Sequence, residues 1–517
     1  MAADNNALSR KLLTSDIPFQ LYNTASRKKE PFKTEEPSKV SFYSCGPTIY
    51  DYAHIGNFRA FLTYDVLKRW LLYSGYSVEH ICNLTDVDDK IIKRMARDKI
   101  SLPELTEKYA QVFFEDLKAL NIVPASRYPR ATEHIDDIVH MVQELMERGF
   151  AYESQGSVYF RVNKFPAYGK LARLDFSGME RGAGEGGGIN DADEYVAEKG
   201  DAKDFALWKA YKEEDGPVFW ETALGKGRPG WHIECSAMAR TYLGLTVDVH
   251  AGGVDLVFPH HENEVAQSEA ANGGKRFCNC WVHNGFVNVE NEKMSKSKGN
   301  FLTLKGSLKG GLELRAFRYL VVTSQYRSPL NFNKEGLEGA KKTVMRLDKL
   351  RKRLLDVVEK GKEDEGGFGM KDVIEKALKG FEAGMADDLN TPRAAAALFT
   401  LVKGAEKALK STPPFLPPSE AREVLVALER MDEVLGIFYD PPSVEGGVEG
   451  GEEGGGPVIV ALKDLPVEAQ ELVRRRGKAK ENKIWGEADG CRDALKSKFG
   501  VILKDVKGGE VQIMKEG

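Results

Sequence analysis

Two side chains at helical spacing suggest half of a metal site. His260 and Glu264 lie four residues apart in the string PHHENE, and a helix beginning there would place both on one face. Cys45 and Cys235 add two candidate thiolates. Two sulfurs, one imidazole and one carboxylate form a tetrahedral set of the kind that zinc prefers. Each residue alone is more often structural, because buried cysteines are common and a His-His-Glu run can simply begin a solvated helix.

A second thiol pair, Cys278 and Cys280, competes for the same role. On a strand, side chains two residues apart point to the same face, but no histidine ligand is expected beside this pair. We therefore interpret the Cys278 and Cys280 pair as side chains that pack in the protein interior and do not bind a metal.

The string HIGN at residues 54–57 could bind phosphate. It lies between an expected strand and an expected helix, and the N-terminus of such a helix offers free N–H groups and a positive partial charge. Gly56 would let a ligand approach the backbone, and His54 could donate to phosphate oxygens. An isolated string of this kind is usually only a capped helix, so a further observation is needed.

A lysine-rich loop supplies that observation. The string KMSKS at residues 293–297 contains Lys293 and Lys296 with two serines, and it follows an expected strand at Val282–Val289. Amines and hydroxyls in one short loop suit a triphosphate, although a charge run alone is usually just solvated.

A glycine pair could admit the base of a nucleotide. In the string HAGGVD, Gly252 and Gly253 lie at an expected strand end, where they would permit close packing against a planar base. Asp255 could accept a hydrogen bond from a ribose hydroxyl. Glycine-rich turns are common, so this signal is weak alone.

Alternating strands and helices must position these residues. Apolar runs at 39–45 and 78–84 predict buried strands, with helix-period segments at 61–71, from Asp88, at 105–120 and at 135–145. This alternation predicts an α/β fold with a Rossmann-like parallel sheet. Short alternating runs within 151–224 indicate hairpins, and the α/β character returns near Gly230, so this segment is expected to be an insertion that splits the domain.

The chain becomes helical beyond about residue 337. Apolar residues at three- and four-residue spacing predict amphipathic helices, and Thr391 before Pro392 is the expected N-cap of one of them. An acidic, glycine-rich linker then precedes a small mixed segment. The predicted parts are an N-terminal arm (1–36), two halves of the α/β domain (37–150 and 225–300), the insertion (151–224), a segment after KMSKS (301–340), a helical domain (341–440), the linker (441–457) and a small C-terminal domain (458–517).

Composition excludes several classes of protein. The 517 residues carry a net charge of −4, so nucleic acid would be bound through local patches and not through bulk charge. No apolar run approaches the roughly 18 residues of a membrane span, and the first residues do not resemble a targeting peptide. Six scattered cysteines do not form a disulfide framework. We expect a cytoplasmic, reduced protein without a membrane partner.

Together, HIGN and KMSKS resemble the two signatures of the class I aminoacyl-tRNA synthetases. Four further strings resemble blocks of the cysteinyl-tRNA synthetases within that class: CGPTIYD (45–51), NLTDVDDK (83–90), GWHIECSA (230–237) and FPHHENE (258–264). The resemblance extends from about residue 20 to the C-terminus. It includes residues 388–392 as well as Trp485, Asp489 and Arg492.

The resemblance implies a set of roles for these residues. Cysteine would be activated with ATP and then transferred to the 3′-terminal ribose of its tRNA by a chain that is more readily a monomer than a homodimer. Cys45, Cys235, His260 and Glu264 would hold one Zn²⁺, whose bond to the substrate sulfur selects cysteine over serine without an editing domain. Mg²⁺ would accompany ATP. The implied roles are catalysis for His54, Asn57, Lys293 and Lys296, ATP binding for Gly56, Gly252, Gly253, Asp255 and Lys296, and binding of the substrate cysteine for Gly46, Thr85 and Trp231.

One departure and two alternatives accompany this interpretation. Asn57 stands where the class signature usually has histidine; an amide can still donate a hydrogen bond, but without charge. A ligase that joins cysteine to a sugar amine would share the zinc and ATP motifs while lacking residues 340–517. An inactive, RNA-binding paralogue would have lost KMSKS or the metal ligands.

Overall fold

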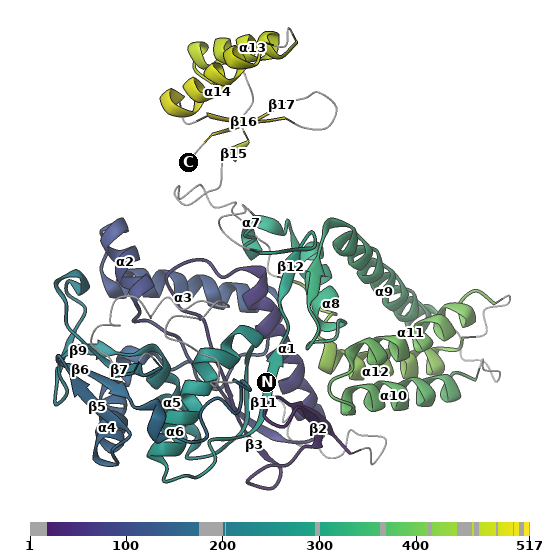
Figure 1. The fold of residues 1–517 in the computed structure, drawn as a ribbon. Helices are drawn as coiled ribbons and strands as arrows, with labels where there is room; N and C mark the ends of the chain where they lie inside the picture. The colour runs from purple at the N-terminus through teal and green to yellow at the C-terminus, as the bar shows by residue number, and fades with distance from the viewer. Residues whose placement is uncertain are drawn as a thin grey trace. The chain divides into compact units, whose positions relative to one another are not determined.

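The computed structural model describes residues 18–174, 200–201, 203–294, 300–361, 369–411, 416–441, 458–459, 465–481, 484–499, 501–505 and 511–515 (Figure 1). The chain divides into two compact units. One contains Met1–Lys293 with Leu302–Ser443, and the other contains Met294–Phe301 with Val444–Gly517.

A four-stranded parallel sheet forms the centre of the larger unit. Its strands are β3 (Lys39–Ser44), β4 (Ser77–Cys82), β10 (Val247–Gly253) and β11 (Cys278–Asn284), in the order β11-β10-β3-β4. Strands with both faces covered read as apolar runs, and Val40, Phe42 and Tyr43 of β3 are buried. The predicted Rossmann-like parallel sheet is confirmed.

Helices connect the strands as the sequence predicts. α1 (Ile55–Tyr73) follows β3, and α2 (Asp89–Asp98), α3 (Leu102–Ala119) and α4 (Ile135–Glu147) follow β4. α1 is buried on nearly all sides, as expected of a helix enclosed by the rest of its domain. The amphipathic α3 and α4 instead bury one face and expose the other.

The insertion forms a five-stranded antiparallel sheet, which confirms the expected hairpins. Its strands are β5 (Ala151–Ser154), β6 (Ser157–Phe160), β7 (Phe205–Ala210), β8 (Trp220–Thr222) and β9 (Gly225–Pro229), in the order β5-β6-β7-β9-β8. A common core joins this sheet to α4, α5 (Trp231–Leu243) and α6 (Glu262–Ala271). The glycine-rich run at 182–188 lies outside the described residues.

The single strand expected at Val282–Val289 is wrong. β11 ends at Asn284, and β12 (Val287–Val289) pairs with β13 (Glu292–Lys293) and β14 (Leu330–Phe332) in a separate sheet. The break falls at Gly285, whose N–H donates to the Tyr326 carbonyl (2.8 Å). A Cβ there would lie 2.8 Å from the carbonyl of Arg327, so a close approach of two backbones interrupts the strand.

Helices dominate the segment that follows β13 (Figure 1). They are α7 (Leu304–Ser307), α8 (Gly311–Val322), α9 (Lys334–Lys360), α10 (Met370–Ala386), α11 (Thr391–Ala408) and α12 (Pro418–Leu435). The predicted N-cap of α11 is wrong by one residue. Asn390 caps the helix by accepting from the Arg393 N–H (3.2 Å), because the Thr391 hydroxyl donates instead to the Ser324 carbonyl (3.0 Å).

A hairpin, β1 (Gln20–Asn23) and β2 (Lys28–Pro31), precedes the parallel sheet. The smaller unit contains β15 (Val458–Ile459), α13 (Val467–Glu481), α14 (Trp485–Phe499), β16 (Val501–Asp505) and β17 (Val511–Lys515). Its core includes Leu465, Leu495 and Val501. Among the helices of the described ranges, none has the length and apolarity that a bilayer crossing requires.

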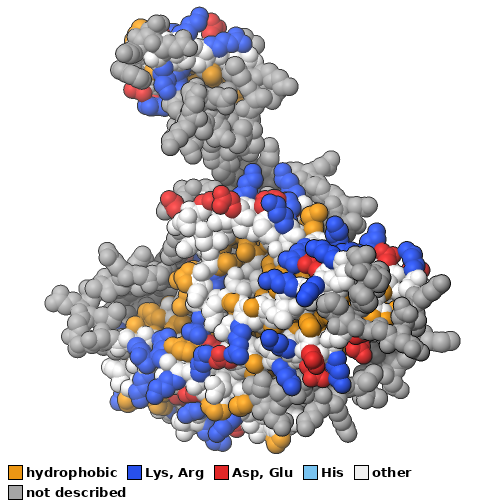
Figure 2. Space-filling model, turned by 90° about the vertical axis from the view of Figure 1, so that its right-hand side faces the viewer, with side chains coloured by type: hydrophobic (Ala, Val, Ile, Leu, Met, Phe, Trp, Pro, Cys, Tyr) orange, Lys and Arg blue, Asp and Glu red, His pale blue; other side chains and the backbone are white. Residues whose placement is uncertain are grey.

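The surface agrees with the small net charge. Figure 2 shows lysines and arginines in several groups on one face, interspersed with acidic, apolar and neutral side chains. Any partner with a negative charge would therefore meet local basic groups there, as the composition predicts.

Candidate metal centre and nucleotide site

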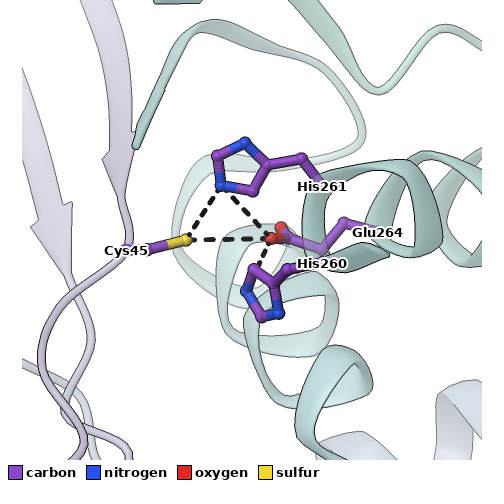
Figure 3. Close-up of side chains that lie close together, drawn as sticks. All are labelled: Cys45, His260, His261 and Glu264. Atoms are coloured by element: carbon purple, nitrogen blue, oxygen red, sulfur yellow. Dashed lines mark hydrogen bonds and ion pairs between the residues drawn. The ribbon is translucent and has the colours of Figure 1, made fainter. Parts of the chain in front are cut away.

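Four buried side chains converge where the parallel strands end. Cys45 follows β3, His260 and His261 belong to the turn before α6, and Glu264 lies in the first turn of α6. One potential ligand atom from each lies within 4.8 Å of the others (Figure 3). The structure brings Cys45, His260 and Glu264 together with His261, whereas the predicted ligand Cys235 is not one of these four.

Direct contacts hold the cluster together. His260 Nε2 lies 3.0 Å from Glu264 Oε1, and Cys45 Sγ lies 3.2 Å from His261 Nε2 (Figure 3). The second nitrogen of each ring also has a partner. His260 Nδ1 is 2.9 Å from Nδ1 of His232, and His261 Nδ1 is 2.8 Å from Nε2 of His283. Such outer partners fix the orientation of an imidazole that holds a metal.

Cys235 contacts the cluster from α5. Its thiol hydrogen bonds with Cys45 and with His260. The hydrogen bond with Cys45 is the largest influence on the pKa of Cys235 and, with the nearby His260, lowers it to about 6 although burial opposes the change. The ionised form of this thiol therefore predominates at neutral pH, as a zinc ligand requires.

The charges of the cluster suit a cation. Burial alone would raise the pKa of Glu264, but His250 and His260 lower it to about 2. Burial would lower the pKa of His260, but Glu264 and Cys235 raise it to about 10. A buried carboxylate and a thiolate thus hold a proton on the imidazole between them. A divalent cation would satisfy the same anions, so the donor set fits Zn²⁺.

Further histidines surround the centre, and the sequence patterns assign them no role there. His250 Nε2 lies 2.9 Å from Glu264 Oε2, and its ring stacks on Trp281 with centroids 4.6 Å apart. His232 and His283 contact His260 and His261. These histidines come from α5, β10 and β11, so only their adjacency in the fold identifies them. His261 had one signal, its place beside His260.

The turn that carries the two histidines differs from the predicted helix start. α6 begins at Glu262, and Val257–His261 form a wider turn in which Phe258 is extended (φ −140°, ψ 134°). His260 and His261 lie four and three residues before Glu264, and both spacings share one face of a helix. Both rings therefore reach the same carboxylate.

Of the three residues expected to bind the substrate cysteine, Gly46 and Trp231 adjoin this cluster and Thr85 lies on a neighbouring segment. Gly46 follows Cys45, and a Cβ there would lie 1.7 Å from the carbonyl oxygen of Asn83. Thr85 is buried and bonded by its backbone to the segment after Gly46. Trp231 begins α5 with its ring centroid 4.3 Å from that of His260.

The HIGN string begins α1 with a reciprocal cap. The Asn57 N–H donates to His54 Nδ1 (3.2 Å), and the His54 N–H donates to Asn57 Oδ1 (3.0 Å). Gly56 lies in the first turn between them. The asparagine therefore has a structural use in this chain that the sequence alone did not suggest.

The other residues expected to bind the nucleotide lie on different elements. Gly252 and Gly253 end β10, and Asp255 lies in the following turn. A Cβ on Gly252 would lie 2.4 Å from His261 Cε1, so this glycine leaves room for the imidazole. Lys293 ends β13. Lys296 lies outside the described residues.

Both groups of residues occupy one edge of the sheet. Ser44 pairs with Ala251 in parallel register, so Cys45 and Gly252 follow at the same edge, and α1 begins beyond β3. Ligands of open parallel sheets bind beyond these carboxyl ends of the strands. The arrangement can hold a metal and a nucleotide side by side.

Comparisons with known proteins agree with this arrangement. Residues 31–342 match the model of the class I (C) tRNA synthetase catalytic domain, and residues 380–439 match the DALR domain. The cysteine–tRNA ligase of Staphylococcus carnosus is 42% identical over 491 residues, which cover 95% of this chain and 98% of the relative. The cysteine–tRNA ligase of Staphylococcus aureus is 43% identical over the same coverage.

A solved structure supports the fold. The Mycobacterium tuberculosis methionyl-tRNA synthetase in complex with methionyl-adenylate matches with a TM-score of 0.56 and 16% identity, covering 77% of this chain and 90% of that protein. At this identity the likeness concerns the fold alone. The sequence matches carry the assignment further: this chain belongs to the cysteine–tRNA ligase family of the class I tRNA synthetases.

Proposed function

We propose that this chain activates L-cysteine with ATP, releases pyrophosphate, and transfers the cysteinyl group to the 3′-terminal ribose of its tRNA. Cysteine–tRNA ligation is the activity of its family. The observation that carries the proposal is the buried Cys45, His260, His261 and Glu264 cluster beside the strand ends at which α1 begins.

Cys45, Cys235, His260 and Glu264 would hold one Zn²⁺. His261, which contacts Cys45 on one side and His283 on the other, would orient the Cys45 side chain. A zinc ion in this set supplies a Lewis acid that prefers a soft thiolate to a hard hydroxyl, and so favours cysteine over serine. The protein residues meanwhile exclude water, because all four side chains are buried.

The residues near the metal ligands would complete the amino-acid pocket. Trp231 packs on His260 and would fix the ring that faces the substrate. Gly46 allows the backbone beside Cys45 to pack closely on the Asn83 carbonyl, and Thr85 lies on the neighbouring segment. No general base is needed, since the substrate carboxylate is already the nucleophile.

Phosphate binding would fall to the two signature strings. The start of α1 carries the positive partial charge of a helix N-terminus, and stabilising charge in this way often contributes more to catalysis than any other effect. Mg²⁺ would accompany the nucleotide. The proposed residues are His54, Gly56, Asn57, Lys293 and Lys296 for the triphosphate, and Gly252, Gly253 and Asp255 for the nucleoside.

The remaining parts would serve the RNA. We assign residues 341–440 to anticodon binding, which the DALR match within them supports. The insertion would face the acceptor arm, and the core that its sheet shares with α4, α5 and α6 favours a structural role for it. A cytoplasmic location and a monomer stay predictions, and light scattering tests the second.

Pyrophosphate exchange tests the proposal. We expect exchange that depends on cysteine and is far weaker with serine, together with charging of a cysteine tRNA by the same preparation. Exchange without charging would instead indicate a ligase with another acceptor. Absence of exchange in a folded, zinc-loaded protein would indicate an inactive paralogue.

A further inference from the structure

A buried arginine joins the start of α1 to two other segments. Arg59 lies two residues after the HIGN string and is 1% exposed. Its guanidinium donates to the carbonyls of Phe286 (2.9 Å), Gln325 (3.2 Å), Tyr326 (3.1 Å) and Ser328. Burial lowers the pKa of Arg59 to about 10, so the side chain stays charged at neutral pH. One rigid fork of donors thus ties α1 to two other backbone segments, at residue 286 and at 325–328.

Both partner segments lead to the second signature string. Phe286 immediately precedes β12, which pairs with β13, and β13 ends at Lys293. Residues 325–328 connect α8 to β14, which pairs with the other edge of β12. Arg59 therefore sets the position of the HIGN helix relative to the strands that carry the first lysine of KMSKS.

An aspartate of the helical segment holds the same loop from the opposite side. Asp388, between α10 and α11, is fully buried. Its Oδ1 accepts from the Tyr326 hydroxyl (2.7 Å) and the Tyr22 N–H (2.8 Å), and its Oδ2 accepts from Arg327 Nε (2.9 Å). Asp388 and Leu389 both have left-handed φ angles, 59° and 48°. Non-glycine residues keep such angles only where surrounding contacts enforce them.

These contacts form one continuous path from the helical segment to the nucleotide site. Tyr326 is the shared member, because its hydroxyl donates to Asp388 while its carbonyl accepts from Arg59. Asp388 belongs to the residues matched by the DALR domain, and Arg59 to those matched by the catalytic domain. A displacement of the turn between α10 and α11 would therefore move the carbonyls that accept hydrogen bonds from Arg59.

We propose that Asp388 and Tyr326 are positioning residues for cysteine activation, which act through Arg59 on the placement of the HIGN helix relative to β12 and β13, the strand that ends at Lys293. The inference rests on the proposed function. Activation without a general base depends on geometry, and small misplacements of the reacting groups lower the rate strongly. The path also gives the helical segment a physical means to influence the catalytic segment.

Tyr326→Phe tests the path with a matched control. It removes the hydroxyl bond to Asp388 and keeps the ring. Tyr73→Phe removes the bond from the Tyr73 hydroxyl to Glu382 Oε1 (2.9 Å) and the bond that this hydroxyl accepts from Arg430 (3.2 Å), at the opposite end of α1. Both tyrosines are buried, so we expect similar losses of thermal stability.

The kinetics should differ between the two variants. For Tyr326→Phe we expect kcat of pyrophosphate exchange to fall by about three- to tenfold, with KM for cysteine unchanged because the metal cluster lies on other elements. Tyr73→Phe should keep the wild-type kcat. Asp388→Asn, which keeps the size of the side chain and removes its charge, should lower kcat in the same direction as Tyr326→Phe.

Either of two results would overturn the inference. One is a folded Tyr326→Phe or Asp388→Asn with wild-type kcat, and the other is an equal fall of kcat in Tyr73→Phe. Loss of exchange in the wild-type chain would contradict the proposed function itself, so the two failures are distinguishable.

Discussion

Replacing Cys235 by serine and, separately, His261 by asparagine would decide which four ligands hold the metal. The sequence predicts Cys45, Cys235, His260 and Glu264. The fold instead brings His261 within 4.8 Å of three of these, while Cys235 contacts the cluster through its thiol hydrogen bonds. We expect Cys235→Ser to disrupt the metal site far more than His261→Asn.

The size of the effect follows from the ligand count. A four-ligand zinc site binds with about 10–16 kcal/mol at neutral pH, so one ligand accounts for about 3 kcal/mol, or roughly a hundredfold in affinity. Cys235→Ser should therefore release zinc to a chelator at about a hundredfold lower concentration than the wild type. His261 contacts Cys45 from outside the predicted set, and loss of such a partner should cost about tenfold.

Metal analysis after dialysis against graded chelator gives the affinity. The cobalt-substituted protein gives the ligand type, since the near-ultraviolet charge-transfer band reports each thiolate. Cys278→Ser is the matched control, because that buried thiol donates to the Cys280 carbonyl, away from the cluster. Our reasoning would be refuted if Cys235→Ser kept the wild-type cobalt band while His261→Asn lost the metal.

Three further predictions concern single positions. Asn57→Ala removes the acceptor of the His54 N–H and should cost about 1 kcal/mol in a thermal melt; an unchanged melting temperature would show that the cap is replaced by water. Gly252→Ala should destabilise the fold by about 1–3 kcal/mol, because the new Cβ would lie 2.4 Å from the enclosed His261 ring; a normal melt and normal zinc content would contradict this. Burial raises the pKa of Asp116 to about 7, so the folded state keeps a proton that the unfolded state has lost above about pH 4, and this carboxyl lowers stability increasingly from pH 4 to pH 7. Asp116→Asn should therefore raise the melting temperature more at pH 8 than at pH 4, and an equal shift at both would count against it.

Local patterns predicted the elements of the catalytic part well. The apolar run ending at Cys45 and the apolar segment after it became β3 and α1, because elements enclosed by the rest of a domain keep apolar residues on most of their faces. The errors occurred where a distant segment intervenes. Gly285 breaks the strand expected at Val282–Val289 because a second backbone approaches it, and Asn390 caps α11 because the Thr391 hydroxyl donates to Ser324.

The candidate site was predicted in part for the same reason. Strings such as HIGN and KMSKS could be read directly, since each is contiguous and its chemistry depends on its own residues. His261 was passed over because Cys45, Cys235, His260 and Glu264 already completed a tetrahedral set, although its spacing of three residues from Glu264 also shares a helix face. The path through Arg59 and Asp388 left no pattern in the sequence, because its acceptors are mostly backbone carbonyls.

The sequence by itself determined the class of fold, the split of the α/β domain, the family and most of the chemical groups at the site. Only the tertiary structure decided which groups meet. Cys45 and Glu264 are 219 positions apart in the chain and 3.8 Å apart in space, because β3 and β10 pair in parallel register and end at the same edge. Strand order and register are properties of the assembled sheet. Residue types and spacing determine what a site can do, and the packing of distant segments determines where that site forms.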